Sequence, residues 1–212
     1  MPEHGPAPAP SPRIGDKAPD FTARTTQGMV TLGQFRGRWL VLFSHPADFT
    51  PVCTSEFIAF VRHAADFAAL DCALLGHSVD SLFSHLAWLR LLRDEFGAEV
   101  TFPVIEDPTM EIARGYGMIS ADEATAASVR AVYVIDPAGV IRAINWYPIN
   151  VGRSVAEILR LVAALQRAED GPVITPEGWQ PGDDVLAPPG TLTEEALASK
   201  ACSGWFYREI KT

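Results

Sequence analysis

The stretch Ser44–Phe57 (SHPADFTPVCTSEF) constrains the fold of this chain more than any other segment. It follows a run of strand formers at 39–43 and leads into apolar residues that recur at helical spacing as far as Ala68. Thr50-Pro51 signals a helix start, because threonine accepts a hydrogen bond at the N-cap and proline fits the first helical position. We therefore expect Cys53 in a first helical turn, where free N–H groups and the helix dipole favour the reactive thiolate.

The spacing of Pro46, Thr50 and Cys53 is more informative than the cysteine alone. An isolated cysteine near a helix start is more often a small buried residue than a nucleophile. The pattern Pro-x-x-x-Thr-x-x-Cys, inside its wider string, resembles the signature of the peroxiredoxins, and within that family the one-cysteine type. The resemblance implies that Cys53 is the peroxidatic nucleophile, which peroxide oxidises to a sulfenic acid.

A thiolate at Cys53 needs a cation nearby. A helix N-terminus contributes only about 0.3–1 kcal/mol when exposed, which is less than one pKa unit. Arginine suits the role because it is permanently charged and offers several rigid donors. The resemblance assigns Arg130 to the family's active-site arginine and Arg153 to a second recurrent position. From the residues alone, each could equally be an ordinary arginine at a strand edge or on the surface.

Four further residues are candidates for supporting roles. The hydroxyl of Thr50 is expected to face the peroxide as well as cap the helix, and Pro46 to shield the pocket or simply break the loop. Glu56 is expected to orient an arginine, or to act only as a carboxylate near the helix start. His45 is expected to tune the pocket by hydrogen bonding, or to be a structural histidine.

Composition excludes several partners and cofactors. The 212 residues carry a net charge of -9, which argues against nucleic acid and anionic membrane surfaces. The three cysteines form no Cys-x-x-Cys pair, and this sparse use indicates a reducing, cytoplasmic compartment. We expect no cofactor, and no metal, because the histidines fit no standard zinc spacing; those considered are His45, His63, His77 and His85. Cys72, inside an apolar run, is expected to be an inert core residue.

The order of elements indicates an α/β protein. We expect strands at 18–21, 29–32, 39–43, 72–78, 102–105, 131–135 and 140–144, and helices at 51–69, 81–96, 110–116, 154–167 and 193–199. The helix at 81–96 is expected to bury a leucine-rich face made of Leu82, Leu86, Leu89, Leu92 and Phe96. Alternating strands and helices followed by a hairpin and a final helix are typical of a thioredoxin-like fold, here with peroxiredoxin elaborations and an extended C-terminal arm.

We divide the chain into a disordered lead at 1–12, a thioredoxin-like peroxidase domain at 13–167 and an extension at 168–212. Proline and glycine recur in the extension, which also holds four aromatic residues that need burial: Trp179, Trp205, Phe206 and Tyr207. The resemblance implies that such an extension packs across a homodimer partner, and that dimers assemble into a ring such as a decamer.

Cys202 is the cysteine whose role the sequence leaves open. Some relatives of this branch carry two cysteines in a similar tail, whereas this chain has Arg208 where the second would fall. An arm that crosses a dimer would bring Cys202 near the partner subunit's Cys53, where it could resolve the oxidised thiol. The alternative is a small apolar residue packed beside Trp205.

The leading functional hypothesis is a thiol-dependent peroxidase that reduces hydrogen peroxide and organic (alkyl) hydroperoxides and serves an antioxidant role. It would draw electrons from an external thiol, either thioredoxin-like or of low molecular weight. The alternative is a redox sensor or chaperone scaffold on the same fold without efficient turnover. A dithiol oxidoreductase is disfavoured, because Thr50 occupies the place of the first cysteine in Cys-x-x-Cys.

Overall fold

A computed structural model describes residues 11–119, 128–190, 193–198 and 203–211. The chain divides into two compact units, Met1–Val155 and Ala156–Thr212, and each is described here by itself. This division falls before the last long helix, whereas the sequence suggested a boundary after it, at 167–168. The predicted three-part division stays a prediction, and nearly all of the predicted lead at 1–12 lies outside the described residues.

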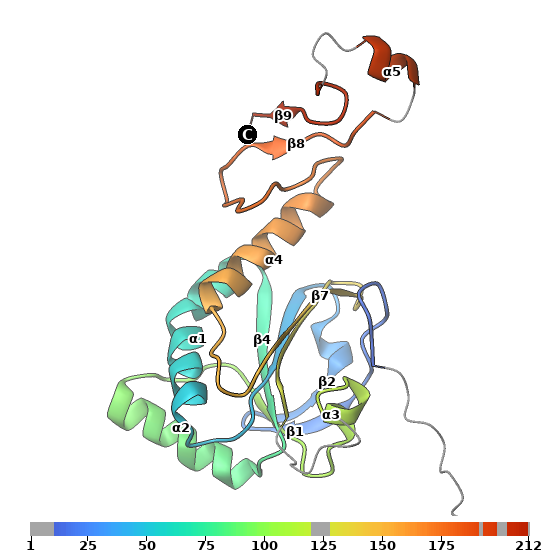
Figure 1. Cartoon of the computed structure of the whole chain (residues 1–212). Helices are drawn as coiled ribbons and strands as arrows, with labels where there is room; N and C mark the ends of the chain where they lie inside the picture. Colours follow the sequence, from blue (N-terminus) through green and yellow to red (C-terminus); the bar gives the residue numbers. More distant parts are fainter. Residues whose placement is uncertain (1–10, 120–127, 191–192, 199–202, 212) are drawn as a thin grey trace, which may run out of the picture. The chain divides into compact units, whose positions relative to one another are not determined.

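The first unit is built on a mixed sheet of seven strands within the described residues, in the order β2-β1-β5-β4-β3-β6-β7 (Figure 1). The strands are β1 (Thr22–Thr25), β2 (Gly28–Thr31), β3 (Trp39–Ser44), β4 (Cys72–Ser78), β5 (Val104–Glu106), β6 (Arg130–Ile135) and β7 (Ile141–Tyr147). The central strands β3, β4 and β5 are parallel, and the neighbours on both sides pair antiparallel. β3 and β4 are buried along their whole length, which explains their continuous apolar sequence.

The helices of this unit are η1 (Leu32–Phe35, a 3₁₀ turn), α1 (Pro51–Ala69), α2 (Leu82–Phe96) and α3 (Glu111–Gly115). Ser81 caps α2 by accepting a hydrogen bond from the Ser84 amide at 3.3 Å. The helix ends at Gly97, whose φ of 63° lies in the left-handed region that glycine adopts without strain. α1 and α2 lie on one face of the sheet (Figure 1), so the helix that carries Cys53 packs directly on the central strands.

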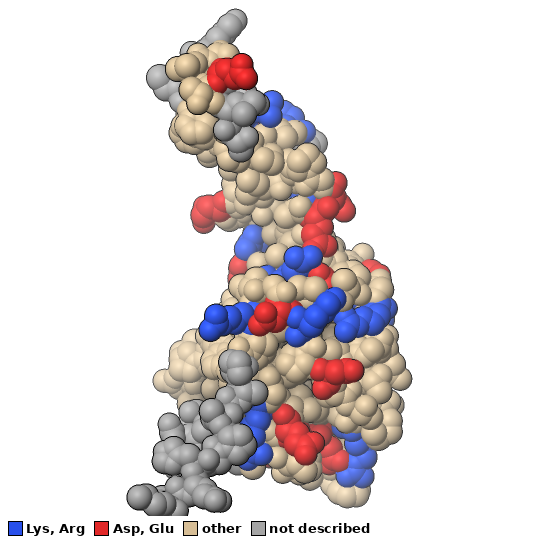
Figure 2. Space-filling view, turned by 90° about the vertical axis from the view of Figure 1, so that its right-hand side faces the viewer, with Lys and Arg blue, Asp and Glu red and all other residues tan. Residues whose placement is uncertain are grey.

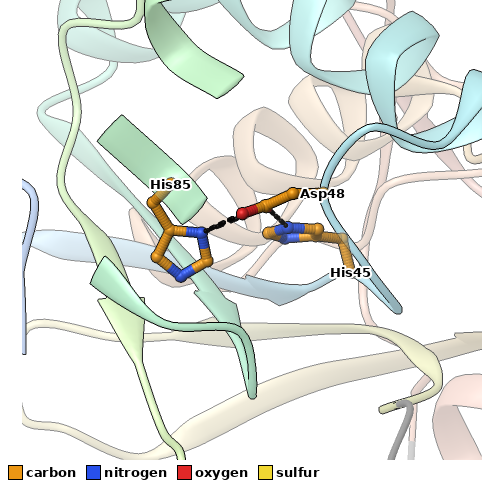
Figure 3. A group of neighbouring side chains, drawn as sticks. All are labelled: His45, Asp48 and His85. Atoms are coloured by element: carbon orange, nitrogen blue, oxygen red, sulfur yellow. Dashed lines mark hydrogen bonds and ion pairs between the residues drawn. The ribbon is translucent and has the colours of Figure 1, made fainter. Parts of the chain in front are cut away.

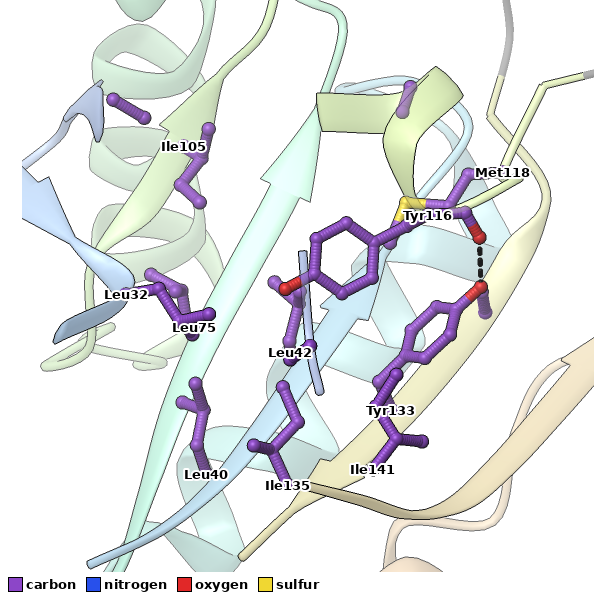
Figure 4. Packing of buried hydrophobic residues seen from close by; sticks show 14 of the residues in the cluster. Leu32, Leu40, Leu42, Leu75, Ile105, Tyr116, Met118, Tyr133, Ile135 and Ile141 are labelled. Carbon is purple, nitrogen blue, oxygen red and sulfur yellow. Dashed lines mark hydrogen bonds between the residues drawn. The ribbon is translucent and has the colours of Figure 1, made fainter. Parts of the chain in front are cut away.

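Two apolar layers fill the unit. On the face opposite α1, the sheet packs against residues from η1 and the end of α3, and Figure 4 shows Leu32, Leu75, Tyr116 and Tyr133 in this layer. On the α1 face the layer is aromatic, with Phe43 stacked on Phe60 at 4.0 Å between ring centroids. The side chains of both layers are largely buried, and they fix the position of β3 and β6, which bracket the site.

Three sequence expectations needed correction. The segment 18–21 is not a strand, because Pro19 has no N–H to donate and the Asp20 carboxylate accepts the Phe21 amide instead; β1 begins at Thr22. β5 starts later than predicted, after Pro103. α2 is in place, but its buried residues are His85, Trp88 and Leu92, so the predicted leucine-rich face was right only for Leu92.

Of the other residues of that predicted face, Leu82 and Leu89 are half-buried, and Leu86 and Phe96 are exposed. Leu86 is 45% exposed and Phe96 is 54% exposed. The physical reason is that His85 is buried by its polar contacts to Asp48 and the Ile105 carbonyl. The pattern of apolar residues along the helix does not register such contacts.

The second unit contains α4 (Val155–Glu169), β8 (Val185–Leu186), α5 (Thr193–Ala198) and β9 (Glu209–Ile210). Trp179 is buried, and its indole N–H donates to the Asp183 carbonyl at 3.1 Å. The other predicted aromatic residues, Trp205, Phe206 and Tyr207, remain 40–51% exposed. Ser199, the predicted end of the short helix, and Cys202 lie outside the described residues.

The helices and the surface charges can be compared with the predictions that neither a membrane nor a nucleic acid is a partner. Among the described residues, no helix is both long and apolar enough to cross a membrane. On the face that Figure 2 shows, basic and acidic side chains lie next to one another, so that face carries no single large basic patch among the residues drawn in colour.

Candidate active site

Cys53 lies in the first turn of α1, as predicted. Thr50 has extended backbone angles at the N-cap, Pro51 occupies the first helical position, and the Thr54 amide donates to the Thr50 carbonyl at 2.9 Å. Phe49 precedes them with a φ of 55°, a left-handed conformation that turns the chain into the helix. The sulfur is completely buried, although it sits at a helix end.

The hydroxyl of Thr50 differs from the expectation. It makes no side-chain cap bond to the helix, and donates instead to the Ala47 carbonyl at 2.9 Å. Because the hydroxyl proton is used in this contact, the lone pairs of the oxygen are what Thr50 can offer to another group. Threonine therefore shapes the loop ahead of the helix rather than closing its first turn.

Arg130 contacts the sulfur of Cys53. Its Nη1 lies 3.3 Å from Sγ and 2.8 Å from Oε2 of Glu56, and its Nε donates to the Ile149 carbonyl at 2.9 Å. The side chain is only 2% exposed, and it leaves β6 on the face that α1 covers. Three fixed partners hold the guanidinium, so the donor that faces the sulfur is preorganised.

Glu56 links the two predicted arginines. Its Oε1 accepts from the Arg153 amide at 2.8 Å and Nε at 2.9 Å, and its Oε2 accepts from Arg153 Nη2 at 2.6 Å. Arg153 Nη1 also donates to the carbonyls of Ser44 and Ala131 at 2.8 and 2.9 Å. One carboxylate lies between two guanidinium groups, which leaves one net positive charge beside the buried sulfur. Removal of water strengthens the attraction of that charge for a thiolate.

Pro46 and His45 lie in the segment between β3 and α1. Pro46 is buried, in agreement with the predicted shielding position. His45 is also buried, but its Nε2 faces Asp48 Oδ1 at 2.9 Å, and its carbonyl accepts from the Ser128 hydroxyl at 3.0 Å. His45 therefore joins a polar cluster next to the site.

Sequence reasoning missed Asp48 and His85, which complete that cluster (Figure 3). His85 Nδ1 lies 2.8 Å from Asp48 Oδ2, and both side chains are buried. From the sequence we considered His85 only as a metal ligand; the available signal was a histidine one turn before Trp88, in line with Leu92 on the same helical face. The spacing of the histidines also concealed that His45 and His85 share a carboxylate.

Two imidazoles and a carboxylate are metal-ligating groups, and their ligand atoms lie within 4.8 Å of one another. Their separations of 2.8–3.0 Å are those of direct hydrogen bonds, which occupy both carboxylate oxygens. Two further histidines of the described residues lie elsewhere, His63 beside Asp66 and His77 beside Asp107. The absence of a metal stays a prediction.

Burial and hydrogen bonding set the charges in the cluster. Burial lowers the pKa of His45 below its ordinary value of 6.5, against the opposing hydrogen bond to Asp48. Burial acts to raise the pKa of Asp48, but hydrogen bonds from His45 and His85 outweigh it and hold this pKa well below 3.8. At neutral pH, His45 is therefore a neutral imidazole that donates to a charged Asp48.

Two family models match the sequence. The model described as "AhpC/TSA family" matches residues 14–144, and the model described as "C-terminal domain of 1-Cys peroxiredoxin" matches residues 164–200. The first covers β1 to β7 and therefore includes Cys53 and Arg130. The second begins within α4 and runs into the predicted extension.

Known proteins are similar over nearly the whole chain. A peroxiredoxin of Thermoplasma volcanium is 44% identical over 201 residues, covering 93% of this chain and 98% of its own length. Peroxiredoxin 2 of Picrophilus torridus is 48% identical, covering 87% of this chain and 90% of its own. Among solved structures, a yeast mitochondrial 1-Cys peroxiredoxin superposes with a TM-score of 0.84 at 38% identity, covering 94% of this chain and 99% of that one. A cysteine-to-serine mutant of peroxiredoxin 6 from Arenicola marina gives 0.82 at 32% identity, covering 94% and 97%. These superpositions confirm the predicted thioredoxin-like fold with peroxiredoxin features.

Proposed function

Because the chain belongs to the peroxiredoxin family of thiol-dependent peroxidases, we propose that Cys53 is its nucleophile and that it reduces hydrogen peroxide and small organic hydroperoxides. The single observation that carries the assignment is the 3.3 Å contact between Arg130 Nη1 and Cys53 Sγ at the start of α1. Of the two cysteines in the described residues, Cys53 is the one whose sulfur has both a guanidinium partner and a helix N-terminus.

In the proposed reaction, the Cys53 thiolate attacks one oxygen of the peroxide. The S–O bond forms as the O–O bond breaks, the sulfur loses two electrons and becomes a sulfenic acid, and the leaving oxygen takes a proton to give water or an alcohol. Two thiol equivalents then return Cys53 to the thiol, and yield a disulfide and water. Arg130 supports the first step, because its Nη1 can donate to the oxygens on which negative charge develops.

Thr50 and Pro46 have complementary roles in this proposal. The Thr50 hydroxyl donates to the Ala47 carbonyl, so its oxygen is oriented to accept the O–H of a bound peroxide. Pro46 limits the space beside the sulfur and excludes bulkier electrophiles. Glu56 and Arg153 hold Arg130 in place, since Glu56 bonds to both guanidinium groups.

The reductant and the assembly are further parts of the proposal. The yeast 1-Cys peroxiredoxin structure concerns thiol resolution through glutathione and thioredoxin systems. We propose an external thiol reductant of either kind for this chain, a cytoplasmic location, and a homodimer that assembles into a ring such as a decamer. The match of residues 164–200 to the 1-Cys C-terminal domain supports an extension that packs on a dimer partner.

The test of the function is peroxide consumption by the purified protein with dithiothreitol, glutathione or thioredoxin as the reductant. We expect many turnovers per Cys53, at a rate above that of the free thiol. One oxidation event per chain without turnover would instead favour the redox sensor or scaffold.

Cys202 can be tested separately from the nucleophile. If the arm brings Cys202 to the partner subunit's Cys53, one equivalent of peroxide gives a covalent dimer on a non-reducing gel, and Cys202→Ser abolishes it. A monomer band that carries sulfenic or sulfinic acid at Cys53, read by mass spectrometry, would contradict this and show resolution by an external thiol.

A further inference from the structure

Three buried polar side chains meet beside the segment that joins β3 to α1 (Figure 3). Asp48 is at the centre, and its carboxylate faces His45 Nε2 at 2.9 Å and His85 Nδ1 at 2.8 and 3.0 Å. The second ring nitrogen of His85 lies 3.2 Å from the Ile105 carbonyl. When Nδ1 carries the proton, His85 donates to Asp48 and links the segment to α2, on which it sits; the ring donates to the Ile105 carbonyl of β5 as well only when it is protonated on both nitrogens.

The backbone of Asp48 adds a second tie. Its amide donates to Asp80 Oδ2 at 2.7 Å, and Asp80 lies in the connection between β4 and α2. The Asp80 amide in turn donates to the Ser78 hydroxyl at 3.1 Å at the end of β4. Asp48 thus connects the segment 45–50 to the neighbouring connection as well as to α2.

The segment held in this way carries two of the groups assigned to the peroxide. Pro46 lies before Asp48, and Thr50 lies two residues after it. Phe49, between Asp48 and Thr50, adopts a left-handed backbone conformation that residues other than glycine rarely adopt. Such a turn persists only when its surroundings fix it, and the contacts of Asp48 are the adjacent fixed point.

The sulfur and its cation are held by different contacts. Arg130 is fixed by Glu56 and the Ile149 carbonyl, and Glu56 is fixed by Arg153. None of these contacts passes through Asp48 or His85. The two halves of the site, the charged pair and the peroxide-facing segment, therefore have separate supports.

We propose that Asp48 and His85 are positioning residues for peroxide reduction, which hold the segment 45–50 so that Thr50 and Pro46 meet a peroxide at Cys53. The inference rests on the proposed function. It predicts a selective defect. Loss of the contact between His85 and Asp48 slows the attack of Cys53 on peroxide, because that reaction needs Thr50 in place. It does not slow the alkylation of Cys53, because that reaction needs the thiolate and Arg130 but not Thr50, and a displaced Pro46 only widens access to the buried sulfur.

The test compares two substitutions of one residue. His85→Leu removes the donor to Asp48, and we expect the oxidation of Cys53 by hydrogen peroxide to slow by about 10- to 100-fold, since a misplacement of about 1 Å can cost that much. His85→Gln keeps a side-chain N–H that can reach Asp48, and we expect it to restore the rate to within a few-fold of wild type. His63→Leu is the matched control, because His63 pairs with Asp66 at 2.9 Å on the solvent side of α1.

The second readout is the rate at which iodoacetamide alkylates Cys53. We expect it to be as fast in His85→Leu as in wild type, or faster if Pro46 is displaced, while the rate with peroxide falls. The inference is overturned if His85→Leu reacts with peroxide as fast as wild type, if both rates fall together, or if His85→Gln is as slow as His85→Leu.

Asp48→Asn replaces His85→Leu if that variant does not fold. Asparagine keeps one acceptor oxygen for two imidazole donors, so we expect the same split between the two rates with a smaller loss, and wild-type behaviour overturns the inference. A wild-type protein that peroxide does not oxidise at Cys53 overturns the proposed function itself, which separates the two failures.

Discussion

Cys53 and Cys72 are equally inaccessible, but their surroundings differ in every respect that matters for reactivity. Cys53 is fully buried in the first turn of a helix with a guanidinium 3.3 Å from its sulfur. Cys72 is 3% exposed at the start of β4, and its Sγ lies 3.7 Å from the Ala73 carbonyl. Burial raises the pKa of Cys72 to about 12, so it is a thiol at any physiological pH.

The comparison shows that burial does not decide whether a cysteine reacts. A helix N-terminus points N–H groups at Cys53 and a guanidinium contacts its sulfur, whereas at Cys72 burial outweighs the more distant charge of Arg38 and the backbone hydrogen bond from Val41. Burial therefore protects Cys72 as a core residue, and around Cys53 it strengthens the pull of Arg130. The same property, removal from water, has opposite consequences because the nearest charges differ.

The largest effect should separate the two cysteines directly. We expect Cys53→Ser to reduce peroxide turnover to the level of the free reductant, because serine cannot supply a thiolate of similar shape. Cys72→Ala should retain turnover within about twofold, with a small loss of stability of roughly 1 kcal/mol from the missing sulfur. Peroxide consumption and thermal unfolding measure both. A folded Cys72→Ala protein without turnover would refute the comparison.

A smaller effect should come from removing the cation. Arg130→Met should slow the oxidation of Cys53 by about 10²–10³-fold, the usual loss for one preorganised donor. The fold should survive, because Glu56 keeps its bonds to Arg153. The alkylation of Cys53 at neutral pH should slow as well, which distinguishes this variant from His85→Leu.

Arg142→Met is the control for that substitution. Arg142 lies on β7 beside Asp136 at 2.7 Å and is partly exposed, so it tests the loss of an arginine away from the sulfur. Equal rates for Arg130→Met and wild type, under single-turnover conditions, would show that the guanidinium contact is not what activates Cys53.

The sequence was most informative where the signal was local. The Thr50-Pro51 start places Cys53 in the helix from capping and proline geometry alone, and α1 has the predicted bounds of Pro51–Ala69. Arg130 and Arg153 are 77 and 100 positions away from Cys53, and no spacing rule brings them to it. The resemblance to a family suggested Arg130, and the structure shows the contact.

The failures have a common physical cause. The spacing of apolar residues in α2 predicted that Leu86 and Phe96 are buried. The face that is buried instead contains His85, whose partners Asp48 and Ile105 come from other elements. A polar residue is buried only when tertiary partners satisfy it, and those partners cannot be read from the helix itself. The cluster around Asp48 was therefore invisible to periodicity.

The smallest predicted effect is a pH dependence of stability that arises on the Cys53 side of the sheet. Burial holds the pKa of His45 in the folded protein below its ordinary value of 6.5. Below pH 6.5 the unfolded chain binds a proton that the folded chain does not, so the free energy of unfolding falls as the pH is lowered. One such proton changes it by at most about 1.4 kcal/mol per pH unit.

Asp48 does not contribute in this window, because its lowered pKa means that its stabilisation is lost only well below pH 3.8. Urea unfolding at pH 7 and pH 5 measures the effect, with His45→Asn and, as a control, His63→Asn at the surface. We expect the free energy of unfolding to differ less between pH 7 and pH 5 in His45→Asn than in wild type, and to differ as in wild type in His63→Asn. An unchanged pH dependence in His45→Asn would mean that the His45 imidazole takes up its proton in the folded state. The buried groups beside Cys53 would then accommodate a positive charge more readily than the burial of His45 implies.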